Sequence, residues 1–227
     1  MTTSEPLMNR KNTARQDQFL PGKALPVMVA IGLVVFLVVY LVVALRGAGQ
    51  VGSNSLLQPA SPQRISPIFT TSVQHWEPKI VEWASANGLD PNLVATVMQI
   101  ESCGNPNAVS IAGASGLFQV MPFHFYEGED HFDPDTNAMR GMAYLSDSLY
   151  NADGLEELAL AGYNGGIGII FTDQAYWANE TLDYMYWGGG IYADAASGVQ
   201  ESPRLQEWLG AGGYSLCNSA QVSLGLP

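Results

Sequence analysis

The chain has 227 residues and a formal net charge of −12, and 47% of its residues are hydrophobic. This length accommodates one domain with appendages. The acidic composition argues against nucleic acid as a partner, because binding to nucleic acid requires a basic surface. It also argues against tight adhesion to anionic lipid headgroups, and we expect the charge to serve solubility.

The N-terminal region has the composition of a membrane anchor. Residues 1–25 are polar, carry four of the basic residues and are expected to form a disordered cytoplasmic tail. Val27 to Leu45 is a run of 19 uncharged residues within the predicted transmembrane helix 26–46. A cleaved signal peptide is the alternative, but its apolar core would be shorter, and Arg46 disrupts the cleavage site near Ala44.

The charges predict how this helix is oriented. Residues 1–46 carry five Lys and Arg against two Asp and Glu, whereas the remainder carries four against nineteen. Positive flanks stay in the cytoplasm. We therefore expect a single-pass protein of the bacterial cell membrane, with a cytoplasmic N-terminus and everything after the anchor outside the cytoplasm.

Residues 47–70 are rich in Gly, Ser, Gln and Pro and predict a flexible linker, followed by a folded domain over 71–227. Helical spacing of apolar residues runs from residue 72 to 87, with a break expected at Pro78 and an end at Gly88. Trp76 and Trp83 occupy this helical spacing, which favours core positions over sugar platforms.

The next helix ends in a candidate catalytic acid. Asp90-Pro91 is a favourable helix start, an apolar face follows as far as Ile100, and Gly104 suits the residue past the end. Glu101 then lies in the last turn, where the helix dipole and apolar neighbours raise a carboxyl pKa. A carboxyl group that stays protonated near neutral pH is a general acid, whereas a solvated surface Glu is the alternative.

A long motif decides between these alternatives. The chain reads Glu-Ser at 101–102, Asn-Pro-Asn-Ala-Val-Ser at 105–110 and Gly-Ala-Ser-Gly-Leu-Phe-Gln-Val-Met-Pro at 113–122. This pattern closely resembles the catalytic domain of the soluble lytic murein transglycosylase type, glycoside hydrolase family 23, which is related in fold to goose-type lysozyme. The resemblance implies a mainly α, lysozyme-like helical domain, here attached to a single N-terminal transmembrane helix.

Three later segments extend the resemblance. Residues 133–145 match a structural Asp-Pro-x-x-Asn segment, Tyr-Asn at 163–164 matches a motif that lines the sugar groove, and Glu180 to Tyr184 matches the last family motif. A second short helix is expected from Leu155 to Gly162. The three glycines at 188–190 depart from the family, and we expect them to interrupt the helix after Tyr184.

The acidic loop 123–135 does not match a metal site. Ala138 stands where a calcium loop requires Gly, and the two His residues of the loop have no zinc-type partner spacing. We expect no metal and no cofactor.

The resemblance implies the chemistry. In this chemistry Glu101 protonates the oxygen that bridges N-acetylmuramic acid and N-acetylglucosamine in peptidoglycan. Glu101 then removes the proton of the muramyl 6-hydroxyl, which yields a 1,6-anhydro sugar. Substrate-binding roles are implied for a group of six residues: Ser110, Gly116, Gln119, Tyr163, Asn164 and Tyr184. Peptidoglycan strands are the expected partner, and protein partners stay unknown.

Two alternatives to this activity stay open. One is a hydrolytic lysozyme-like muramidase in which a further carboxylate, Asp133 or Asp135, positions water. The other is a catalytically idle peptidoglycan-binding module, which would have no need of Glu101.

The two cysteines, Cys103 and Cys217, are expected to form a disulfide in an exported domain, with two free thiols as the alternative.

Overall fold

The computed structural model describes residues 64–227. The predicted cytoplasmic tail, the transmembrane helix and the linker up to residue 63 lie outside the described residues. The elements of the described part are α2 (Thr71–Gln74), α3 (Glu77–Asn87), α4 (Pro91–Glu101), η1 (Pro122–His124), α5 (Pro134–Asn151), α6 (Glu156–Gly165), η2 (Ile167–Phe171), η3 (Gln174–Tyr176), α7 (Asn179–Ser197), α8 (Pro203–Trp208), the π-helical turn η4 (Leu209–Gly213) and α9 (Tyr214–Leu224).

The predicted mainly α class is confirmed. The described residues contain no β-sheet, only isolated bridges that pair Ser115 with Val109 and with Val120. Within residues 64–227 no helix combines the length and the apolar character needed to cross a membrane.

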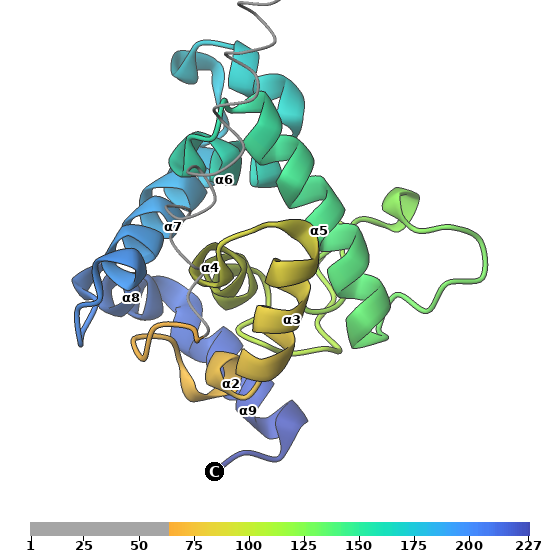
Figure 1. Ribbon diagram of the computed structural model, residues 1–227, viewed down its shortest axis with the longest axis vertical. Coiled ribbons are helices and arrows are strands. Elements are labelled where there is room, and N and C mark those ends of the chain that lie inside the picture. The colour runs from red at the N-terminus through yellow and green to blue at the C-terminus, as the bar shows by residue number, and fades with distance from the viewer. Residues whose placement is uncertain (1–63) are drawn as a thin grey trace, which may run out of the picture. The chain divides into compact units, whose positions relative to one another are not determined.

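Helix α4 lies at the centre of the helices (Figure 1). It packs against α3 and α7, and every residue from Pro91 to Gln99 is buried. The predicted start is confirmed, because the Asp90 side chain accepts a hydrogen bond from the Asn92 backbone N–H at 2.7 Å. A buried, capped helix is a rigid support for the residue at its end, which is Glu101.

For the segment before α4, the structure confirms the predicted helix boundaries and contradicts the predicted end of the linker. The predicted break near Pro78 and the end at Gly88 are confirmed, since α2 and α3 are separate and Gly88 is left-handed. The end of the predicted linker is wrong, because residues 64–70 belong to the folded domain. Phe69 is buried, and the Ser66 backbone N–H donates to the Asn92 side chain at 2.7 Å. A segment held by burial and by hydrogen bonds is not a tether.

The expected interruption at the three glycines is also wrong, since α7 continues from Asn179 to Ser197. These glycines permit close packing of α7 on its neighbours. A Cβ on Gly189 would lie 2.7 Å from Glu157 Cγ, and one on Gly190 would lie 2.5 Å from Arg204 Nε. Tertiary contacts therefore outweigh the low helix propensity of glycine.

The predicted disulfide between Cys103 and Cys217 is present and joins the loop after α4 to α9. The fully buried Gln99 connects this bridge to the start of the domain. Its amide nitrogen donates to Cys103 Sγ at 3.0 Å, and its oxygen accepts from the Thr70 backbone N–H at 3.1 Å. Three distant parts of the sequence thus meet beside the end of α4.

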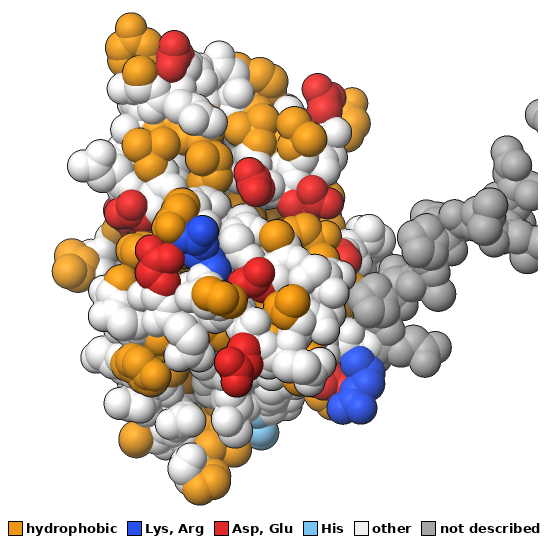
Figure 2. All heavy atoms as spheres, turned by 90° about the vertical axis from the view of Figure 1, so that its left-hand side faces the viewer, with side chains coloured by type: hydrophobic (Ala, Val, Ile, Leu, Met, Phe, Trp, Pro, Cys, Tyr) orange, Lys and Arg blue, Asp and Glu red, His pale blue; other side chains and the backbone are white. Residues whose placement is uncertain are grey.

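The surface of the domain reflects the acidic composition. Figure 2 views the side that carries α7 and α8, where acidic side chains lie among hydrophobic ones and basic side chains are few. The loop between η1 and α5 extends away from the helices (Figure 1).

Candidate active site

The end of α4 is fixed by a tight loop. The Ser102 hydroxyl donates to the Leu117 carbonyl at 2.7 Å and accepts from the Gly104 backbone N–H at 3.0 Å. Cys103 has a φ of +51° and Gln119 a φ of +44°. Non-glycine residues rarely adopt this left-handed region, and such conformations concentrate at functional sites. The backbone at Cys103 and at Gln119 is therefore held in a conformation that non-glycine residues rarely adopt.

Glu101 is partly buried at the C-terminal end of α4. Loss of water around the carboxyl raises the pKa of Glu101 from its ordinary 4.5 to about 8. The nearby Tyr184 hydroxyl opposes this rise in pKa, and the negative charge of Glu180 adds to it. A carboxyl group in this setting holds its proton at neutral pH and can donate it.

Tyr184, a residue of α7, lies beside Glu101. Its hydroxyl is buried and has no hydrogen-bond partner of good geometry within residues 64–227. Burial and the charge of Glu101 raise the pKa of Tyr184 well above its usual value, so the hydroxyl keeps its proton. A buried hydroxyl without a partner is costly, and it is available to the Glu101 carboxyl or to a ligand.

The loop 110–120 contains three of the predicted substrate-binding residues. The Ser110 hydroxyl accepts from the Ala114 backbone N–H at 3.0 Å and holds a turn. Gly116 lies against α5, where a Cβ would be 2.3 Å from Asn137 Nδ2. The Gln119 amide donates to the carbonyl oxygens of Ala108 and Gly116 at 3.1 and 2.9 Å. Of these three, only Gln119 lines a hollow at this site.

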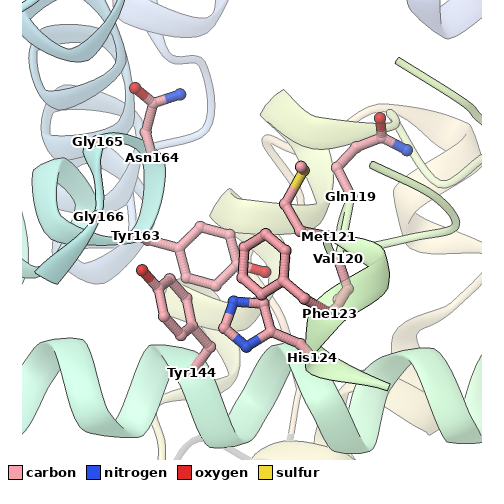
Figure 3. A pocket seen from close by; sticks show the side chains of 10 residues that line it. All are labelled: Gln119, Val120, Met121, Phe123, His124, Tyr144, Tyr163, Asn164, Gly165 and Gly166. Carbon is pink, nitrogen blue, oxygen red and sulfur yellow. The ribbon is translucent and has the colours of Figure 1, made fainter. Parts of the chain in front are cut away.

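The first hollow, which we call the aromatic hollow, has a volume of about 210 Å³. Figure 3 shows its aromatic rings side by side, with Gln119 and Asn164 at opposite margins. The rings of His124 and Tyr144 are 4.7 Å apart, and those of Tyr144 and Tyr163 are 5.5 Å apart. Its lining residues are Gln119, Val120, Met121, Phe123, His124, Tyr144, Tyr163, Asn164, Gly165 and Gly166.

Hydrogen bonds fix two of these residues. The Tyr163 hydroxyl donates to the Phe118 carbonyl at 2.8 Å, and Asn164 Oδ1 accepts from the Thr181 hydroxyl at 2.8 Å. Partial burial lowers the pKa of His124, so its ring is neutral near pH 7. The aromatic hollow thus offers flat uncharged faces and a few fixed polar groups.

The second hollow, which we call the acidic hollow, has a volume of about 410 Å³ and is lined in part by Glu101. Asn164 lines both hollows, which makes them neighbours on one surface. The lining residues of the acidic hollow are Ile100, Glu101, Asn164, Glu180, Asp183, Tyr184, Trp187 and Trp208. A chain-like ligand that extends through both hollows would pass Glu101.

The sequence pointed to some of these residues and missed others. It gave Glu101 a catalytic role and Gln119, Tyr163, Asn164 and Tyr184 substrate-binding roles, and all five line one of the two hollows. It missed the further carboxyls and both tryptophans of the acidic hollow. Positions 180, 184 and 187 share one face of α7, and this helical spacing is the signal that could have indicated Glu180 and Trp187.

The two carboxylates that the sequence offered for a hydrolase, Asp133 and Asp135, lie outside the acidic hollow. Asp133 caps α5 by accepting from the Thr136 backbone N–H at 2.8 Å. Asp135 accepts hydrogen bonds from Lys79 and Trp83, both at 2.9 Å. Neither lines a hollow that contains Glu101. Over residues 64–227, no group of three or more His, Cys, Asp or Glu side chains could hold a metal ion.

Part of the chain matches a known protein family and several known proteins. Residues 78–182 match the family model described as "Transglycosylase SLT domain". A "Transglycosylase" of Enterobacteria phage PRD1 is 39% identical over 149 residues, which cover 60% of this chain and 53% of that protein. A "Membrane-bound lytic murein transglycosylase F" of Desulfosudis oleivorans is 31% identical over 125 residues, covering 52% of this chain and 28% of the relative.

A solved structure is also similar: an inactive mutant of lytic transglycosylase Slt from Pseudomonas aeruginosa aligns with a TM-score of 0.43 and 26% identity, covering 55% of this chain and 24% of that one. The chain spans about half the length of the phage relative and less than a third of the Desulfosudis one. The family match and the family motifs fall on the same residues, from α3 to the start of α7. Residues 78–182 of this chain thus match the transglycosylase SLT family model, and the relatives that this region resembles are transglycosylases, among them a lytic murein transglycosylase.

Proposed function

We propose that this protein is a peptidoglycan lytic transglycosylase that cleaves the bond between N-acetylmuramic acid and N-acetylglucosamine with Glu101 as its single acid and base. The observation that carries the proposal is the raised pKa of Glu101, about 8, in a hollow next to a second, aromatic hollow. The family match and the names of the relatives support the same activity.

The proposed reaction has two proton transfers. Protonated Glu101 first donates to the bridging oxygen while the bond from this oxygen to the muramyl anomeric carbon breaks. The acetamido oxygen of the same sugar stabilises the positive charge that develops on the ring. The Glu101 carboxylate then takes the proton of the 6-hydroxyl, whose oxygen bonds to the anomeric carbon. The products are a 1,6-anhydro end and a free 4-hydroxyl, and Glu101 regains its proton.

The remaining groups have supporting roles in this proposal. The Tyr184 hydroxyl has a free hydrogen-bonding capacity beside Glu101 and would stabilise its carboxylate between the two steps. Tyr163, Asn164 and Gln119 would contact the glycan along the aromatic hollow. Ser110 and Gly116 would act through the shape of the loop 110–120, which their contacts with Ala114 and Asn137 maintain.

One observation favours a second candidate, a hydrolytic muramidase. Glu180 and Asp183 line the acidic hollow together with Glu101. A retaining or inverting glycosidase uses two carboxyl groups that flank the scissile bond. One of these two side chains, rather than Asp133 or Asp135, would then position a water molecule.

The test is the mass of the products. Purified peptidoglycan is digested with the folded domain, and the released muropeptides are weighed, with the Glu101→Gln variant as the control. Lytic transglycosylation releases fragments one water lighter than those with reducing ends. Reducing ends in the wild-type digest, absent from that of the variant, would establish hydrolysis instead. Equal release by wild type and variant would contradict the role of Glu101.

We also propose that the domain is exported and held at the bacterial membrane by residues 26–46, with residues 1–25 in the cytoplasm. The charge distribution and the uncharged run from Val27 to Leu45 support this topology. The test uses full-length protein in spheroplasts: external protease should remove the catalytic domain and leave a short membrane-bound fragment. Protection of the domain from protease would contradict this orientation.

A further inference from the structure

One wall of the acidic hollow lies outside the residues that match the family. The match ends at residue 182, whereas Asp183, Tyr184 and Trp187 on α7 and Trp208 on α8 all line the hollow. Half of the lining residues therefore come from the part of the chain that the family model does not cover. Tyr184 belongs to a motif that the sequence already indicated, but the two tryptophans do not.

The chemistry of this hollow restricts its ligand. It combines two indole rings with the carboxyls of Glu101, Glu180 and Asp183, and no Lys, Arg or His lines it. Flat aromatic rings present apolar area against which the C–H face of a sugar packs. Carboxylates accept hydrogen bonds from hydroxyl groups but repel anions. The hollow thus suits an uncharged sugar ring with several hydroxyls.

Trp187 has an unused hydrogen-bond donor. Its indole nitrogen is buried and has no acceptor within the part of the chain that the structure describes. Buried N–H groups are nearly always paired, because an unpaired one loses its water without compensation. An acceptor oxygen on a bound sugar, such as an acetamido carbonyl, would satisfy this group.

Trp208 forms a fixed part of the wall. The residue is only 6% exposed, and a Cβ added to Gly213 would lie 2.5 Å from Trp208 Cε3. Helix α9 follows Gly213 and is joined to the loop beside Glu101 by the Cys103–Cys217 disulfide. The bridge therefore holds the segment carrying Trp208 next to the acid.

We propose that Trp187 and Trp208 form a binding subsite for one uncharged N-acetylated hexosamine ring of the glycan, adjacent to Glu101. Trp187 contacts the ring and donates its N–H to an oxygen of the sugar, and Trp208 closes the wall behind it. The inference rests on the proposed function, because it takes the glycan as the ligand, but binding can be measured without cleavage.

The experiment uses the Glu101→Gln variant, which is not expected to cleave, and measures the Kd of tri-N-acetylchitotriose by calorimetry. Trp187→Ala in this background should weaken binding about tenfold or more. Trp187→Phe, which keeps a ring but loses the N–H, should weaken it about fivefold. Trp177→Phe is the control, because Trp177 is a buried tryptophan that lies outside both hollows, so this change should leave the Kd unchanged.

The outcomes separate this proposal from the proposed function. Unchanged Kd values for both Trp187 variants, at unchanged Tm, would overturn the subsite even if the wild type cleaves peptidoglycan. No binding by the Glu101→Gln parent at the highest soluble concentration would also overturn it. Binding that requires Trp187, in a protein that releases no muropeptides, would support the subsite and contradict the enzyme. Tighter, Trp187-independent binding of the cationic glucosamine trimer would show that the carboxylates select the ligand, against the proposal.

Discussion

Two carboxyl groups at opposite helix ends show how placement decides the chemistry of a side chain. Glu101 ends α4, where it is partly buried, and loss of water raises its pKa to about 8. Asp133 precedes α5, where it is exposed and accepts a hydrogen bond from the Thr136 backbone N–H. A carboxylate is favourable at the start of a helix and unfavourable at its end. The first group is suited to proton transfer, and the second stabilises the fold.

Asp135 extends the contrast. It lies two residues after Asp133 on the exposed first turn of α5, and hydrogen bonds from Lys79 and Trp83 lower its pKa. A group with a lowered pKa stays ionised and is a poor general acid. Hence the acidic loop, which has the higher density of carboxyls, is the less suitable place for catalysis.

The largest expected effect is on catalysis by Glu101. Glu101→Gln keeps the size and most contacts of the side chain but has no proton to transfer, so kcat should fall by about 10² to 10⁴. The measurement is the rate of muropeptide release at pH 6. Binding of glycan and the circular dichroism spectrum should be unchanged. A variant that retains a tenth of the activity would remove Glu101 from its catalytic role.

Glu101→Gln should also raise the free energy of unfolding, by an amount that depends on pH. The pKa of Glu101 is about 8 in the folded state and about 4.5 when the chain is unfolded. The folded state therefore binds more protons between these pH values, and the free energy of unfolding falls as pH rises through this window. Relative to wild type, Glu101→Gln should be more stable by about 2 kcal/mol at pH 8, after allowance for partial exposure, and equally stable at pH 4. Denaturant titrations at both pH values measure this difference.

The second effect tests what keeps Glu101 buried. The disulfide from Cys103 to Cys217 closes a loop with a sequence separation of 114 residues. Its removal by Cys217→Ala should lower the free energy of unfolding by about 2–5 kcal/mol, as measured by denaturant titration under oxidising conditions. A looser domain admits water around Glu101, so the alkaline limb of the kcat profile should move to lower pH. An unchanged limb would mean that α4 alone holds the carboxyl.

A smaller effect is expected at the other helix end. Asp133→Ala removes the cap of α5 and should lower the free energy of unfolding by about 1 kcal/mol while kcat changes less than twofold. Asp147→Ala is the matched control, because Asp147 is an exposed residue of the same helix without a capping role. If kcat fell strongly at unchanged stability, Asp133 would have a part in the chemistry after all.

The smallest effect concerns Glu180. Its negative charge raises the pKa of Glu101, so the neutral Glu180→Gln should lower that pKa. Because the acid must be protonated to start the reaction, activity should then be lost at a lower pH, by less than about one unit. Asp183→Asn is the control: this carboxyl lines the same hollow but is not among the groups that shift the pKa of Glu101. Equal shifts for both variants would indicate a general charge effect.

The sequence predicted the features that depend on local chemistry. Asp90 and Pro91 start α4, Gly88 ends α3, and Glu101 falls in the last turn of its helix, because caps and periodic apolar residues act over a few positions. The features that depend on distant contacts were not predictable in this way. The glycines 188–190 remain helical because Glu157 and Arg204 pack against them.

The candidate site divides along the same line. Glu101, Gln119, Tyr163 and Asn164 stand in motifs that can be read from the chain. Trp208 has no local pattern that marks it, since only the packing of α8 against α7 brings it to the acidic hollow. Residues 64–70 were missed for a similar reason, because a composition typical of linkers says nothing about Asn92 and Gln99, to which they bond.

The bridge between Cys103 and Cys217 also makes residues 103–217 a closed covalent ring. Gln119, Tyr163, Asn164, Tyr184 and both tryptophans of the acidic hollow belong to this ring, and Glu101 lies two residues before it. A single proteolytic cut in the exposed loop between η1 and α5 would therefore leave the two pieces joined. Such nicked protein should migrate as one species without reductant, and it can keep its acid and its groove together in surroundings where proteases are present.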